Sequence, residues 1–215
     1  MLRNAKVLDL ESYKRIQHFN YFKGMAYPYV GITTDVDITD FIFHIKEKKY
    51  PFFLTFLWCV AKAANEIPEL RQRIYKKGIL EYENCGTSHT VAKEDGTYCY
   101  CALDCHKPLE AFISYAKEKQ EVVKDQGDLK EEGSDSLGLF FISSLPWLSY
   151  SALIQPTPFP ADSNPRITWG KYDQKEGKTV LPVSILCNHA LVDGRHISNF
   201  FAHLQEVLKL EETTF

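Results

Sequence analysis

The chain has 215 residues, of which 45% are hydrophobic and 25% charged, with a formal net charge of −3 at pH 7. This composition is that of an ordinary globular protein, and the length suffices to bury one sizeable core as a single domain over residues 1–215. The charge gives no electrostatic footprint for nucleic acid, and no apolar run reaches the length of a membrane-spanning helix. The N-terminal segment lacks the apolar core of a signal peptide, so we expect a cytoplasmic protein.

The first half of the chain predicts three helices and two hairpins. Residues 10–19 are expected to form a short helix and residues 27–36 a strand. A helix with apolar residues on one face follows over residues 37–48, and the most apolar helix spans residues 52–67 between two prolines. Hairpins are expected around residues 76–78 and around the Asp95-Gly96 turn signal.

The second half predicts one long helix and the central strands. A helix is expected over residues 109–123, a charged solvent loop over 124–136 and a buried strand over 138–145. The proline-rich segment 155–165 reads as an irregular connection. Strands at 166–172 and 179–187 then precede the final helix. These elements predict a two-layer α/β sandwich, with a mixed, largely antiparallel sheet and helices packed on one face.

Six cysteines occur, three of them in a cluster with a histidine: Cys99, Cys101, Cys105 and His106. The spacing C-x-C-x3-C-H does not match the usual zinc patterns, and a strand would place Cys99 and Cys101 on one buried face. We expect reduced, structural cysteines and no metal site.

The chemistry is expected where the strand 179–187 ends. The short segment after it carries His189 and Asp193, and Gly194 follows at once before the final helix. Polar groups at the end of a buried strand are held rigidly yet open to a cleft, which suits a catalytic base. Asp193 before glycine also reads as an ordinary helix N-cap.

Several segments carry a family resemblance. The run H-A-L-V-D-G at residues 189–194 fits the H-x-x-x-D-G signature of the coenzyme A-dependent acyltransferases, and the chain resembles the chloramphenicol acetyltransferase family over nearly its whole length. Four further segments agree in order and spacing: residues 13–19, residues 48–51 with 68–71, residues 142–147 (I-S-S-L-P-W) and residues 168–172 (T-W-G-K-Y).

The resemblance implies a function and residue roles. The family transfers an acetyl group from acetyl-CoA to a hydroxyl of a small molecule, with chloramphenicol as the leading acceptor, and forms a homotrimer with sites between subunits. The implied base is His189, with Nδ1 held by a main-chain carbonyl. The other implied roles are an Arg15–Asp193 pair that fixes the turn, Ser143 as oxyanion donor, Thr168 near an ordered water, and Tyr172, Trp147, Lys48 and Tyr50 lining the coenzyme A site.

The sequence departs from the family around the acceptor. Asn188 stands where the family has a histidine before the base, and Phe22 and Val30 replace the family's tyrosine and phenylalanine in the acceptor pocket. Two alternatives therefore stay open: a related acyltransferase of another small hydroxylated acceptor, and a non-catalytic binding homologue. Dihydrolipoyl acyltransferase cores share the motif, but no lipoyl domain or Ala/Pro-rich linker is expected here, and peptide-synthetase condensation domains are about twice this length from the family's general pattern.

Overall fold

The computed structural model describes residues 4–126 and 136–210, and all structural statements refer to these two segments. The helices in them are α1 (Ile16–Phe22), α2 (Thr39–Lys48), α3 (Phe52–Asn65), α4 (Leu109–Gln126) and α5 (Gly194–Val207), with 3-10 turns at η1 (Pro68–Arg71) and η2 (Ser136–Gly138). The strands are β1 (Ala5–Val7), β2 (Tyr29–Asp37), β3 (Gln72–Tyr75), β4 (Gly78–Tyr82), β5 (Gly86–Ala92), β6 (Tyr98–Leu103), β7 (Leu139–Ser144), β8 (Arg166–Trp169), β9 (Asp173–Lys175) and β10 (Lys178–Asn188).

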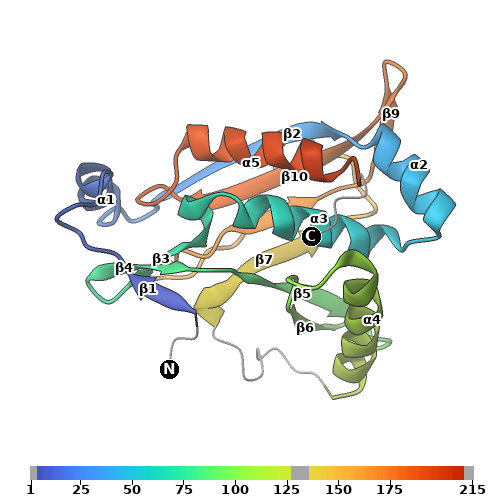
Figure 1. Ribbon diagram of the computed structural model, residues 1–215, viewed down its shortest axis with the longest axis horizontal. Coiled ribbons are helices and arrows are strands. Elements are labelled where there is room, and N and C mark those ends of the chain that lie inside the picture. The colour runs from blue at the N-terminus through green and yellow to red at the C-terminus, as the bar shows by residue number, and fades with distance from the viewer. Residues whose placement is uncertain (1–3, 127–135, 211–215) are drawn as a thin grey trace.

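Two sheets form the fold (Figure 1). The larger has the order β2-β10-β8-β7-β5-β6, with β9 beside β10, and β7 pairs in parallel with both β5 and β8. The other pairs are antiparallel, which confirms the prediction of a mixed, largely antiparallel sheet. The smaller sheet, β1-β4-β3, contains the hairpin expected around residues 76–78, and its three-residue strand β1 was not predicted.

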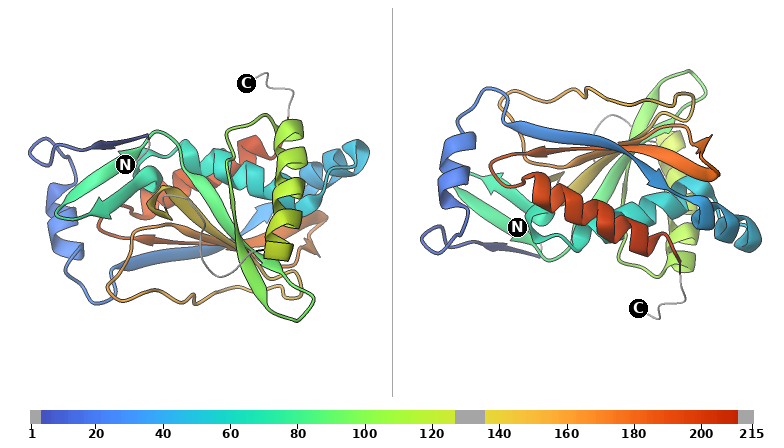
Figure 2. Two further views of the ribbon diagram at one scale, coloured as in Figure 1. Left: turned by 90° about the horizontal axis from the view of Figure 1, so that it is seen from below. Right: turned by 90° about the horizontal axis from the view of Figure 1, so that it is seen from above.

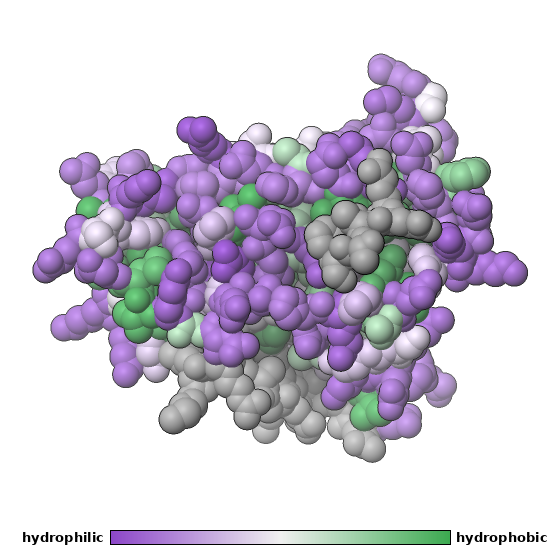
Figure 3. All heavy atoms as spheres, in the orientation of Figure 1, coloured by the Kyte–Doolittle hydropathy of each residue, from purple (hydrophilic) through white to green (hydrophobic). Residues whose placement is uncertain are grey.

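The helices and the sheet share one hydrophobic core. Every second side chain along β10 packs in the core: Leu181, Val183, Ile185 and Cys187. Helices α3 and α5 cover that face of the sheet (Figure 2). Because side chains alternate along a strand, Ser184 between them points to the opposite face, which α3 and α5 do not cover. The surface of α5 away from the core is mostly hydrophilic (Figure 3), as expected for an amphipathic helix.

Two predicted elements need correction. The helix expected over residues 10–19 begins only at Ile16. The carboxylate of Asp9 accepts hydrogen bonds from the Glu11 N–H at 3.0 Å and the Ser12 hydroxyl at 2.8 Å, and such local bonds favour a turn over a helix. The loop expected over residues 124–136 is helical up to Gln126, and residues 127–135 lie outside the described segments.

Within residues 4–126 and 136–210, no helix is long and apolar enough to cross a bilayer. Over the same segments no group of three or more His, Cys, Asp or Glu side chains could hold a metal ion. All six cysteines are buried thiols.

Candidate active site

The turn after β10 holds the imidazole of His189 in a defined orientation. Its backbone N–H donates to the carbonyl of Pro28 at 2.7 Å, and the N–H groups of Leu191 and Val192 both donate to the Asn188 carbonyl at 3.1 Å. The ring nitrogen Nδ1 lies 2.8 Å from the Val192 carbonyl oxygen. Because a carbonyl oxygen only accepts, Nδ1 carries the proton and Nε2 keeps a free lone pair.

An aromatic ring packs on this imidazole. Phe22, at the end of α1, stacks on His189 with 4.0 Å between ring centroids and an interplanar angle of 24°. The half-buried imidazole is thus fixed by a hydrogen bond at one nitrogen and by a stack on one face.

Asp193 fixes the end of the same turn. Its carboxylate accepts a hydrogen bond from the Arg195 N–H at 3.0 Å as the N-cap of α5, and it also accepts one from the guanidinium of Arg15. Burial alone would raise the pKa of the Asp193 carboxyl, but His196, Arg15 and the Arg195 N–H together hold that pKa below its usual range. Asp193 is therefore both an ordinary helix cap and the partner of Arg15.

Two hydroxyl side chains lie side by side on the parallel pair β7 and β8. Ser143 and Thr168 are register partners on the face of the sheet opposite the α3 and α5 layer. The Thr168 hydroxyl donates to Gln155 Oε1 at 3.1 Å, and its carbonyl accepts a hydrogen bond from the Tyr150 hydroxyl at 3.1 Å. Both hydroxyls line a pocket of about 770 Å³ whose other polar lining residues include Ser88, Thr90, Tyr100 and Arg166.

The imidazole is remote from these hydroxyls within one chain. Thr168 pairs with Ser184 on β10, and His189 follows Ser184 by five residues. At roughly 3.3 Å per residue this separation is about 16 Å along the strand, and Ser143 lies one strand farther away. A single reacting atom cannot contact both His189 and Ser143 of the same chain.

The four residues expected to line the coenzyme A site lie near the carboxyl ends of β7 and β8 or beside α3. Trp147 is 77% exposed and Tyr172 is 47% exposed. Their two loops are joined by a hydrogen bond from the Lys171 N–H to the Leu148 carbonyl at 2.7 Å. A Cβ at Gly170 would lie 2.5 Å from that carbonyl oxygen, so glycine permits the close approach of the two loops.

Tyr172 also contacts the start of α3. Its ring centroid lies 5.9 Å from that of Phe52, which follows Tyr50 by two residues. The Tyr50 hydroxyl donates to Glu110 at 2.7 Å, and Lys48 is the exposed last residue of α2.

Neither of the two expected acceptor residues lines the 770 Å³ pocket, and other residues do. Phe22 contacts the imidazole, whereas Val30 pairs with Cys187 and packs against the core, away from the 770 Å³ pocket. Gln155 and Arg166 line that pocket but were missed in the sequence. Arg166 stands two residues before Thr168, so strand alternation could have placed it on the same face.

Known proteins of similar sequence identify the class to which this chain belongs. A family profile described as chloramphenicol acetyltransferase matches residues 3–205. The chloramphenicol acetyltransferase of Clostridium butyricum is 26% identical over 210 residues, covering 95% of this chain and 94% of the relative. Chloramphenicol acetyltransferase 3 of Escherichia coli is 26% identical over 207 residues, covering 95% and 97%.

Solved structures agree with these sequence matches. A chloramphenicol acetyltransferase structure superimposes with a TM-score of 0.86 at 26% identity, covering 95% of this chain and 100% of the other. A probable dihydrolipoamide acetyltransferase from Listeria monocytogenes shares the fold, with a TM-score of 0.68 at 16% identity, and covers 93% and 92%. The fold is thus that of the coenzyme A-dependent acyltransferases. The chain belongs to the chloramphenicol acetyltransferase family.

Proposed function

We propose that this protein is an acetyl-CoA-dependent O-acetyltransferase, that chloramphenicol is its acceptor, and that residues 1–215 act as a single domain in the cytoplasm. The family and the names of its relatives support this activity. The observation that carries the proposal is the orientation of His189. Its Nδ1 is hydrogen-bonded to the Val192 carbonyl, which leaves Nε2 free to accept a proton.

The reaction needs one base and no covalent enzyme intermediate. Nε2 of His189 takes the proton from the acceptor hydroxyl as that oxygen attacks the thioester carbonyl carbon. When the tetrahedral intermediate collapses, the carbon–sulfur bond breaks and the protonated imidazole returns the proton to the thiolate of coenzyme A. The hydrogen bond from Nδ1–H to Val192 stabilises the ring while it is positively charged.

The hydroxyls of the pocket would stabilise and orient the reacting groups. Ser143 would donate to the oxyanion of the tetrahedral intermediate, where the charge develops. The hydroxyl of Thr168 already donates a hydrogen bond to Gln155. The Thr168 hydroxyl oxygen would therefore accept a hydrogen bond from an ordered water or from the acceptor.

Coenzyme A would lie over the loops that follow β7 and β8. Tyr172 and Trp147 present exposed rings suited to stacking on adenine or packing on the pantetheine arm. Lys48 and the hydroxyl of Tyr50 would act at the same end of the sheet, the lysine as a point charge for a phosphate group.

A complete site would require two copies of the chain. His189 lies about 16 Å along β10 from Ser184, which is the register partner of Thr168, and Ser143 pairs with Thr168 on the far side. The base of one chain must therefore face the pocket of another chain. A closed ring of head-to-tail copies meets this requirement, and we propose a homotrimer with three such sites.

Coenzyme A release tests the proposal directly. The purified protein is incubated with acetyl-CoA and a thiol reagent, with and without chloramphenicol, as wild type, His189→Ala and His203→Ala. His203 is an exposed histidine of α5 and serves as the matched control. We expect drug-dependent release in the wild type and the control and none in His189→Ala; undiminished release in His189→Ala would exclude His189 as the base.

The residues beside His189 and around the pocket favour a second acceptor class. Phe22 offers no hydroxyl, and Arg166 places a guanidinium in the pocket wall. Another small hydroxylated acceptor is therefore the alternative. Acetyl-CoA binding without drug-dependent release would direct the search to such alcohols, and binding without turnover of any acceptor would indicate a non-catalytic homologue.

A further inference from the structure

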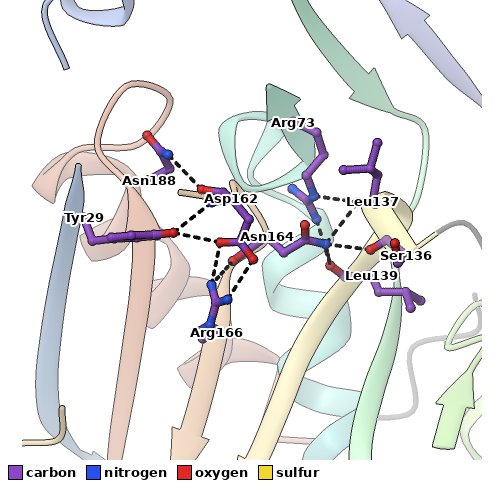
Figure 4. Close-up of polar contacts among 9 residues, drawn as sticks. All are labelled: Tyr29, Arg73, Ser136, Leu137, Leu139, Asp162, Asn164, Arg166 and Asn188. Atoms are coloured by element: carbon purple, nitrogen blue, oxygen red, sulfur yellow. Dashed lines mark hydrogen bonds and ion pairs between the residues drawn. The ribbon is translucent and has the colours of Figure 1, made fainter. Parts of the chain in front are cut away.

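The amide side chain of Asn188 joins the turn of His189 to a remote segment (Figure 4). Asn188 is the last residue of β10 and is only 2% exposed. Its Nδ2 donates to the main-chain carbonyl of Asp162 at 2.8 Å, and its Oδ1 accepts from the Ala190 N–H at 3.1 Å. Both ends of the amide are therefore used, one by the Asp162 segment and the other by the residue that follows His189.

The residue that receives this hydrogen bond is itself held by the side chains of Arg166 and Tyr29, through four hydrogen bonds. The carboxylate of Asp162 accepts from Arg166 Nη1 and Nη2 at 2.8 and 2.7 Å, which is the bidentate geometry of a strong ion pair. The Tyr29 hydroxyl donates to Asp162 Oδ1 at 2.9 Å and accepts from the Asp162 N–H at 3.0 Å. Arg166 in turn lines the 770 Å³ pocket.

The next residues fasten the same segment to the start of β7. Asn164 Nδ2 donates to the carbonyls of Ser136 at 2.7 Å and Leu139 at 2.8 Å. The fully buried guanidinium of Arg73 donates to the carbonyls of Leu137 at 2.6 Å and Leu139 at 3.1 Å (Figure 4). Residues 162–164 have no regular secondary structure, so these side-chain contacts fix their place.

We propose that Asp162 and Asn188 are positioning residues for His189, and that Tyr29 and Arg166 hold Asp162 in place for this purpose. The Asp162 carbonyl fixes the amide of Asn188, and that amide holds Ala190, the residue directly after the imidazole. The carboxylate of Asp162 is bound to Arg166 in the pocket wall, so one partly buried network links the turn of His189 with the pocket of the same chain.

Nothing in this network needs the acceptor or coenzyme A to be present. Every contact is between groups of the chain, and burial and the adjacent Asp162 raise the pKa of the Tyr29 hydroxyl to about 12, so this donor stays protonated well above neutral pH. The kinetic consequences rest on the proposed acetyl transfer, whereas the orientation of the imidazole can be measured without it.

The test compares Asn188→Asp with a matched control, Asn65→Asp. Asn65 is a second amide that bridges two segments, with Nδ2 donating to the Cys85 carbonyl at 2.9 Å and Oδ1 accepting from the Cys85 N–H at 2.8 Å. Both substitutions replace a donor by a carboxylate oxygen. Tyr29→Phe is the second variant, because it removes two of the four hydrogen bonds that hold Asp162 without adding a charge near His189.

Two readouts are combined: steady-state acetyl transfer to chloramphenicol, and nitrogen-15 NMR of histidine-labelled protein, which reports the tautomer of His189. For Asn188→Asp we expect kcat to fall about 10- to 100-fold at unchanged KM for acetyl-CoA, as for a displaced catalytic group, with Tyr29→Phe showing a smaller loss. In both variants the His189 signals should lose the single Nδ1–H tautomer, while Asn65→Asp should keep it and keep kcat.

The NMR measurement tests the positioning role even if chloramphenicol is not the acceptor. If the wild type does not acetylate chloramphenicol, the proposed function fails while the tautomer still tests the network. If His189 keeps its wild-type tautomer in both Asn188→Asp and Tyr29→Phe, the positioning role is overturned whatever the turnover.

Discussion

Arg15 and Asp193 form an ion pair although 178 residues separate them in the sequence. Arg15 directly precedes α1, and Asp193 caps the N-terminus of α5. The pair thus joins an N-terminal helix, which also supplies Phe22, to the turn of His189. Its side chains are 15% and 32% exposed, so solvent screens the pair only in part.

Arg15→Ala should lower both the stability of the protein and its rate of acetyl transfer. The substitution leaves the Asp193 carboxylate without its charged partner, and we expect the free energy of unfolding to fall by about 1.5–3 kcal/mol, the range for hydrogen bonds to charged groups. Denaturant unfolding and kcat should both be measured. Lys175→Ala is the control, because the Lys175–Asp35 pair is 50% and 40% exposed and should contribute less than about 1 kcal/mol. Equal effects of the two substitutions would contradict a special role for Arg15.

Ser143→Ala should lower kcat about 10²- to 10³-fold with little change in KM, the effect of removing one oxyanion donor. The control is Ser144→Ala, one residue later on β7, where alternation points the side chain to the other face. Steady-state kinetics with both substrates distinguishes the two variants. A loss in Ser144→Ala equal to that in Ser143→Ala would remove the oxyanion role from Ser143.

Tyr172→Ala should weaken the binding of acetyl-CoA more than it slows the chemistry. Loss of an exposed stacking ring removes about 1 kcal/mol, so KM for acetyl-CoA should rise roughly five-fold at similar kcat. Tyr98→Ala on β6 removes a tyrosine of similar exposure, 49%, and should leave KM unchanged. An unaltered KM in Tyr172→Ala would place coenzyme A elsewhere.

His89 should make the stability depend on pH below neutrality. The imidazole is 1% exposed, packs near Phe53 and binds Gln120 at 2.9 Å, and burial lowers the pKa of its ring to about 4. The unfolded chain titrates near 6.5, so between pH 6.5 and 4 it binds more protons than the folded chain, and protonation favours unfolding.

The free energy of unfolding should therefore fall as pH drops through that window, by at most about 1.4 kcal/mol per pH unit from this group. Denaturant unfolding at pH 7 and pH 5 measures the change. His89→Gln cannot titrate and should lose less stability between these pH values than the wild type. An identical loss in both proteins would mean that His89 does not carry the effect.

The sequence predicted the elements whose signals are local. The apolar helix between Pro51 and Pro68 appears as α3, and the Asp95-Gly96 signal lies in the turn between β5 and β6, where Gly96 has φ +82°. Strand β1 was not predicted because three residues are too few to show the alternation of hydrophobic and polar residues that indicates a strand. The helix expected over residues 10–19 failed because the turn at Asp9 prevents an earlier start.

The candidate site was predictable only in part. The expected Arg15–Asp193 contact and the bond from His189 Nδ1 to a main-chain carbonyl are both present, whereas the roles of these residues remain predictions. The distance between His189 and Ser143 depends on strand register, which the sequence does not state. Asp162 lies in a proline-rich connection without periodicity, so its contacts with Tyr29 and Asn188 arise only in the folded chain.

Subunit mixing tests the composite acyltransferase site most directly. His189→Ala and Ser143→Ala chains, each nearly inactive alone, are unfolded, mixed in equal amounts and refolded together. If each site takes its base from one chain and its oxyanion donor from the next, about a quarter of the interfaces in a random ring will combine an intact His189 with an intact Ser143. We predict that roughly this fraction of wild-type acetyl transfer returns on mixing; activity that stays at the level of the separate variants would contradict a site shared between chains.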